Sequence, residues 1–175
     1  MNATIYYEFP DGGSNWRGLI VAHVHLAQIN IGRLKAPLDD PSMFGFVSRL
    51  DDINALADRT PGFVWRLQTD EGNATSLRPF DDDRIALNMS VWESLEALRT
   101  YVYSSAHAEV MRGRRDWFEK FERVYLALWW IPAGRIPSID EAKVRLASLE
   151  ERGPTPFAFT FKTTFMPEQA LESIA

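Results

Sequence analysis

LIVAHVHLAQINI, residues 19–31, is the stretch that decides the fold. It is β-branched and apolar at both odd and even positions, which is typical of a strand that is covered on both faces. VYLALWWI at 124–131 has the same character, because a tyrosine hydroxyl is its only polar side-chain group apart from the indole N–H groups. Two such strands predict a sheet that is buried on both sides.

Strand and helix patterns alternate between these two segments. Apolar residues alternate over 63–69 and again over 84–91, as they do in strands. A helix is predicted to begin at Asp40, an N-cap residue, with Pro41 in the first helical position. It should end near Thr60, where proline and glycine follow.

Two more helical patterns follow the third predicted strand. Ser90 and Glu93 have the spacing of a capping box, which predicts a helix that reaches about residue 102. A further helical pattern runs over about 105–121. The order strand, helix, strand, strand, helix, strand is the split βαβ of a ferredoxin-like sandwich. The sequence therefore predicts an α+β fold with antiparallel strand pairing.

The chain divides into three predicted regions. Residues 1–18 are a polar N-terminal extension, 19–132 form the ferredoxin-like α/β-barrel domain, and 133–175 hold a C-terminal helix and an extended arm. A capping box at Ser138 opens that helix. FAFTFKTTF follows it and places phenylalanines on one face of the arm. That row has to be buried, so we expect the arm to pack on the same domain or on a partner.

The two-faced strands also predict an oligomer. Helices in a ferredoxin-like topology cover one face of the sheet, and the other face here is apolar as well. A bare apolar face of that size is an aggregation hazard. The economical solution is a second sheet from an identical subunit, which gives a homodimeric α/β barrel.

Composition excludes several classes of protein. The 175 residues include 19 Lys and Arg against 24 Asp and Glu, a net charge of −5, so bulk positive charge cannot hold nucleic acid or a membrane. The absence of cysteine excludes thiolate catalysis and Cys-ligated zinc. No signal peptide and no membrane span is predicted, which indicates a cytoplasmic protein. Aromatic residues are 13% of the chain, and we expect some of them to line a pocket.

Five long runs carry a resemblance to a known family. They are HLAQINIGRLKAPLDDPSM, INALADRTPGFVWRL, NMSVWESLEALRTYVYSSAHAEVMRGRRDWFE, LALWWIPAGRIPS and GPTPFAFTF. Together they resemble the bacterial family known as domain of unknown function 3291, over about residues 23–166. That family is placed in the dimeric α/β-barrel superfamily, alongside the antibiotic-biosynthesis monooxygenases. The resemblance implies the same fold, whereas a shared fold alone does not determine the chemistry.

One short pattern narrows the chemistry. Asn88 and Trp92 in NMSVW resemble the Asn and Trp that cofactor-free, quinone-forming monooxygenases of the superfamily use on a phenolic substrate. In the alternative interpretation, Asn88 bonds backbone groups at the end of a strand and Trp92 packs in the core.

His107 is the candidate general base. It lies on the helical stretch expected to face the sheet, and a histidine with a pKa near neutrality can remove a phenol or enol proton. Its alternative is a core histidine bonded to a carbonyl. The predicted catalytic residues are thus His107, Asn88 and Trp92. The predicted substrate-binding residues are Trp65, Tyr103, Trp117, Trp129 and His25. The four aromatic ones are expected, with Trp92, to line one cavity between sheet and helices.

Charged and metal-binding groups give weaker signals. His23 and His25 are two apart on a strand, so they share a face, but no third ligand has a fixed spacing to them. We therefore expect no metal and no cofactor. The basic cluster Arg112, Arg114 and Arg115 is either a solvated helix face or an anion clamp for a carboxylated substrate.

These observations predict a cofactor-independent, monooxygenase-like enzyme for a hydrophobic phenolic or enolic small molecule. One alternative is a non-catalytic dimeric protein that binds such a molecule. A second alternative is a haem-binding member of the same superfamily, which needs an axial histidine in the cavity.

Overall fold

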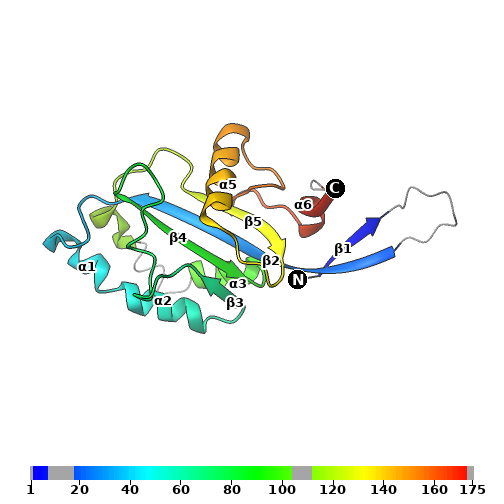
Figure 1. The fold of residues 1–175 in the computed structure, drawn as a ribbon, viewed down its shortest axis with the longest axis horizontal. Helices are drawn as coiled ribbons and strands as arrows, with labels where there is room; N and C mark the ends of the chain where they lie inside the picture. Colours follow the sequence, from blue (N-terminus) through cyan, green and yellow to red (C-terminus); the bar gives the residue numbers. More distant parts are fainter. Residues whose placement is uncertain (1, 8–17, 104–111, 173–175) are drawn as a thin grey trace.

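A four-stranded antiparallel sheet forms the centre of the fold (Figure 1). The computed structural model describes residues 2–7, 18–103 and 112–172. The strands are β2 (Gly18–Arg33), β3 (Phe63–Arg66), β4 (Ile85–Trp92) and β5 (Leu126–Pro132). They lie in the order β3-β4-β2-β5, and every neighbouring pair is antiparallel. This is the strand order of a ferredoxin-like sandwich, so the predicted α+β fold is confirmed.

An additional strand lies in the region predicted as a polar extension. β1 (Asn2–Tyr7) pairs antiparallel with the first residues of β2, from Gly18 to His23. The two paired segments project away from the main sheet (Figure 1).

Helices α2 (Leu50–Arg59) and α3 (Leu95–Val102) cover one face of the sheet, which we call the helical face. It carries the even-numbered residues of β2, β4 and β5, because side chains alternate along a strand. Its apolar core includes Leu26, Trp92 and Leu128, all of them fully buried.

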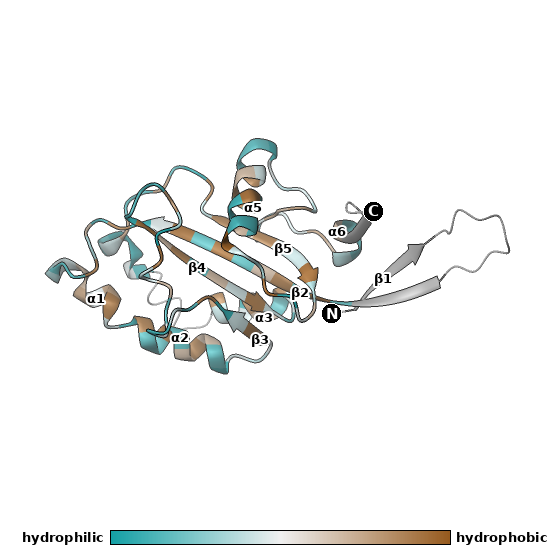
Figure 2. Ribbon diagram, in the orientation of Figure 1, coloured by the Kyte–Doolittle hydropathy of each residue, from teal (hydrophilic) through white to brown (hydrophobic). Residues whose placement is uncertain are grey.

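The opposite face is covered by α5 (Ile139–Arg152), and we call it the α5 face. Buried residues of this helix, Ala142, Leu146 and Leu149, pack on the odd-numbered strand residues, among them Met89 and Trp129. Figure 2 shows apolar residues along β2, β4 and β5 and hydrophilic residues on much of α2 and α5. The expectation of a bare second face was therefore wrong, because a helix of the same chain lies on it. Burial of this face does not require a partner subunit.

The N-caps of the helices were predicted in two cases of three. The Asp40 carboxylate accepts a hydrogen bond from the Ser42 backbone N–H at 2.8 Å, and Ser138 Oγ accepts one from Glu141 N–H at 3.1 Å. The predicted cap at Ser90 is wrong, because this residue is still in β4 and Ser94 caps α3.

The single helix predicted after Asp40 is divided into three pieces. They are a 3₁₀ turn at Pro41–Met43, α1 (Phe44–Val47) and α2. The last piece ends at Arg59, followed by Thr60 as its C-cap, close to the expected end.

The C-terminal arm packs on its own domain but is not a regular strand. Phe159 forms a single bridge with Leu128 of β5, with N–H to carbonyl bonds of 2.8 and 2.9 Å, and is fully buried. The predicted row of phenylalanines is broken at Phe157, which is 37% exposed and lies beneath the guanidinium of Arg145. A short helix, α6 (Pro167–Glu172), follows. Within the ranges given above, no helix has the length and apolar character needed to cross a membrane.

Candidate functional site

A cavity of about 370 Å³ lies on the helical face of the sheet. Strands β2 and β4 form its floor, α2 and the end of α3 supply walls, and the helical residues 112–117 supply another. Its polar lining residues are Gln28, Asn30, Asn54, Asn73, Thr75, Asn88, Tyr101, Tyr103, Arg114 and Tyr125. Most of the remaining lining is apolar, as in many small-molecule sites.

Three carboxamides interrupt the apolar floor. Gln28 and Asn30 are at even positions of β2, and Asn88 is directly opposite Asn30 in β4. Since even positions face the helices, all three side chains lie on the same face of the sheet. Asn88 is exposed although its neighbours in β4 are mostly buried, because the cavity opens above it.

A short hydrogen-bond network holds the Asn88 amide. Gln28 Nε2 donates to Asn88 Oδ1 at 2.7 Å and to Ser90 Oγ at 3.0 Å. The indole Nε1–H of Trp92 also donates to Ser90 Oγ, at 2.8 Å. Since the Oδ1 of Asn88 is already an acceptor, its Nδ2 is the group that can donate into the cavity.

Trp92 lies beneath this network and is not among the residues that line the cavity, where the sequence had placed it. It is fully buried, and its ring stacks on Tyr101 with centroids 5.1 Å apart. Trp92→Phe keeps the ring packing and removes the N–H bond to Ser90. We expect a loss of about 1 kcal/mol in unfolding free energy and a several-fold loss of affinity for a phenolic probe, because the Asn88 amide is held less firmly. Melting curves and titrations check this, and unchanged affinity would leave Trp92 a core residue only.

The structure brings together some of the predicted site residues. Tyr103 and Trp117 line the cavity together with Asn88. His107 lies outside the described residues, so its role stays a prediction.

Three predicted substrate-binding residues lie on the other face of the sheet. Trp129 is paired with Ala27 and Trp65 with Val91, and both indoles pack in the α5-face core. His25 is also at an odd position of β2. The prediction that Trp65 and Trp129 surround the same cavity as Asn88 is therefore wrong, because strand alternation sends them to the α5 face.

His25 is a partly exposed side chain with a buried ring nitrogen. Burial lowers the pKa of His25 below its usual range, which favours the neutral imidazole. Its Nδ1 atom is buried and has no hydrogen-bond partner in the described part of the chain. Over that same part, no three histidine or carboxylate side chains lie close enough together to hold a metal ion.

Tyr101 is a hydrogen-bond donor in the cavity wall. Burial raises the pKa of Tyr101 to about 12, so the phenol stays protonated at neutral pH. Its hydroxyl donates to the Ile53 carbonyl at 3.4 Å. It is therefore unsuited to act as a general base.

Sequence reasoning missed the other carboxamides of the cavity. Gln28 and Asn30 were visible as the polar positions in LAQINI, an otherwise apolar run. Asn54 comes from α2 and Asn73 from the loop after β3, and nothing local in the sequence relates them to Asn88.

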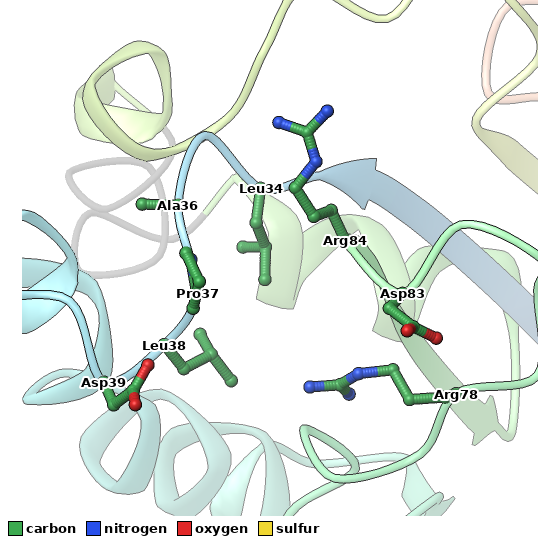
Figure 3. A pocket seen from close by; sticks show the side chains of 8 residues that line it. All are labelled: Leu34, Ala36, Pro37, Leu38, Asp39, Arg78, Asp83 and Arg84. Atoms are coloured by element: carbon green, nitrogen blue, oxygen red, sulfur yellow. The ribbon is translucent and has the colours of Figure 1, made fainter.

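A second hollow, of about 360 Å³, lies between the loop at 34–39 and the segment 78–84 (Figure 3). Leu34 and Leu38 form its apolar side, and Arg78 approaches from the opposite side. Charges of both signs line this hollow, and it contains none of the predicted site residues.

Comparisons with known proteins agree with the sequence resemblance. The family described as Domain of unknown function (DUF3291) matches residues 25–174. No curated protein matches the chain.

Solved structures of similar proteins include the cofactor-independent oxygenase SnoaB from Streptomyces nogalater, at 18% identity and a TM-score of 0.43, covering 64% of this chain and 95% of that one. A protein from Nitrosomonas europaea, provisionally assigned as an antibiotic biosynthesis monooxygenase, has 11% identity, a TM-score of 0.44, and coverages of 68% and 98%. A dabb family protein with a ferredoxin-like fold from Mesorhizobium loti has 14% identity, a TM-score of 0.39, and coverages of 65% and 99%. Because these scores lie below 0.5, the fold assignment rests on the strand order.

Proposed function

This chain belongs to the DUF3291 family, and from that premise and its cavity we propose that it binds a hydrophobic phenolic or enolic small molecule and oxidises it without a cofactor. The observation that carries the proposal is the position of Asn88. Its amide faces a largely apolar cavity and is oriented by Gln28 from the neighbouring strand. A fixed donor in such surroundings stabilises an oxyanion more strongly than the same donor in water.

The proposed reaction needs few protein groups. A base, for which His107 is the candidate, takes the phenol or enol proton, and Asn88 Nδ2 donates to the resulting oxyanion. The electron-rich anion then reduces molecular oxygen. One oxygen atom becomes a new carbonyl on a substrate carbon that carried one hydrogen. The other oxygen atom leaves as water with that hydrogen and the proton that the base had taken. Apolar walls would keep bulk water away from the anion.

A non-catalytic binding protein is the second candidate. The part of the cavity lining that the structure describes contains no histidine and no carboxylate, which favours this candidate. Tyr101, whose pKa is raised to about 12, does not replace them. The haem alternative lacks an axial histidine in the same lining, because His25 lies on the other face of the sheet.

Oxygen uptake separates the first two candidates. The probe is dihydroxyanthrone, a tricyclic compound with phenol and enol forms, in buffer containing a metal chelator. We expect protein-dependent oxygen consumption and the visible absorbance of a quinone product, above the rate with heat-denatured protein. Saturable binding without added oxygen uptake would support the binding protein, and no binding at all would contradict both candidates.

We also propose that the chain is a homodimer. The support is the resemblance to a superfamily of dimeric α/β barrels, together with large apolar side chains exposed in and beside α5, namely Ile136, Val144 and Phe157. Sedimentation velocity at micromolar concentration should give a species of twice the 20.0 kDa chain mass. A 20.0 kDa species would contradict the dimer without affecting the cavity.

A further inference from the structure

The described lining of the helical-face cavity contains one ionisable cation and no anion. Arg114 is that cation, and no aspartate, glutamate, lysine or histidine is among the described lining residues. The chain as a whole has a net charge of −5, so the positive charge in this cavity is opposite in sign to the net charge of the molecule. A neutral ligand would not need this arginine.

Arg114 is also without a carboxylate partner in the described part of the chain. Arg33 and Arg84, by contrast, are paired: Arg33 Nε lies 2.6 Å from an Asp82 oxygen, and Arg84 Nη1 lies 3.0 Å from a Glu119 oxygen. The contact found for Arg114 is with a ring, because its guanidinium carbon is 5.4 Å from the centroid of Tyr125.

That ring contact leaves hydrogen-bonding capacity. A guanidinium that stacks on an aromatic face still presents its N–H groups along its edge. Two of these can meet the two oxygens of a carboxylate in parallel, which a lysine cannot reproduce. The group lies in the wall of a largely apolar cavity, where a charge pair is stronger than on an open surface.

We propose that Arg114 recognises a carboxylate on the ligand, so that the cavity takes a polycyclic aromatic acid whose phenol or enol end reaches Asn88. This proposal rests on the binding part of the proposed function and adds the anionic class of the substrate. The ring system would lie along the apolar walls formed by residues such as Trp117 and Phe118, between the two polar ends.

The test compares two probes of nearly equal shape, anthraquinone carboxylate and its neutral carboxamide, by fluorescence titration at low salt. The wild-type protein should bind the carboxylate about tenfold more tightly, equivalent to about 1.4 kcal/mol. Arg114→Gln should remove that preference and lower the carboxamide affinity far less than the carboxylate affinity. Arg114→Met, which keeps the stem over Tyr125, should behave in the same way.

Arg112 supplies the matched control. It is an exposed arginine of the same helical stretch and does not line the cavity, so Arg112→Gln should leave both affinities unchanged. Equal wild-type affinities for the two probes would overturn the role of Arg114, and so would an equal loss of both probes in Arg114→Gln. Neither of these two results would contradict the proposal that the cavity binds a small molecule. A wild-type protein that binds neither probe would contradict both that proposal and the role of Arg114.

Discussion

Replacing Asn88 with alanine is expected to reduce oxidation or binding of dihydroxyanthrone by about tenfold or more and to leave the melting temperature nearly unchanged. The side chain is exposed to the cavity, so its removal leaves no void in the core. Gln28 loses one acceptor but keeps Ser90, 3.0 Å from its Nε2. The stability cost should therefore be small, and the loss of the oxyanion donor should dominate.

Asn54 provides a matched control for this prediction. It is a carboxamide on α2 that lines the same cavity. Among the described residues, none holds the Asn54 amide as Gln28 holds that of Asn88. Asn54→Ala should change probe oxidation or affinity by much less. Equal losses of oxidation or affinity in the two variants would mean that the probe depends on the general polarity of the cavity and not on a hydrogen-bond donor at Asn88.

His107→Ala extends the test to the proposed base. We expect it to fold normally and to lower the oxidation rate by about tenfold or more while probe binding is largely retained. Full activity in a folded His107→Ala variant would remove this residue from the mechanism and favour the binding protein.

Much of the fold was predictable because alternation and capping are local signals. The run LIVAHVHLAQINI at 19–31 identifies β2, and Asp40 and Ser138 mark helix starts through their own backbone contacts. The prediction at Ser90 was wrong because its spacing to Glu93 fits a cap equally well, whereas its pairing with Gln28 in β2 and Arg66 in β3 keeps it in the strand. Register between strands is a long-range property that the local spacing does not contain.

The candidate site was less predictable for the same reason. Parity places Asn88 and Trp92 on one face, and that part of the prediction agrees with the structure. The alternation of side chains along a strand does not show which face of the sheet α2 and α3 cover. It therefore does not show whether Trp129 or Trp130 faces these two helices. The amphipathic pattern of 139–152 was visible, but nothing in it shows that this helix covers the second face and removes the need for a partner there.

Trp129→Ala is expected to cause the largest loss of stability, about 3–5 kcal/mol in unfolding free energy. The indole is fully buried between the sheet and α5, and its Nε1–H donates to Glu141 Oε1 at 3.0 Å. The variant removes both the packing volume and this bond. Thermal unfolding should show a fall in melting temperature on the order of 10 °C.

Trp129→Phe separates packing from a role in the site. It keeps most of the apolar volume and loses the bond to Glu141, whose carboxylate remains paired with Arg135 at 2.7 Å and Arg145 at 3.2 Å. We expect a loss of about 1 kcal/mol and unchanged affinity for the anthraquinone probes, because the sheet lies between this side chain and the cavity. Trp117→Phe, which alters a cavity wall, should lower the affinity instead. A folded Trp129→Phe variant with weakened probe binding would contradict the assignment of the site to the helical face. The Trp129 indole lies on the α5 face, so it can contact only a ligand that is bound on that face.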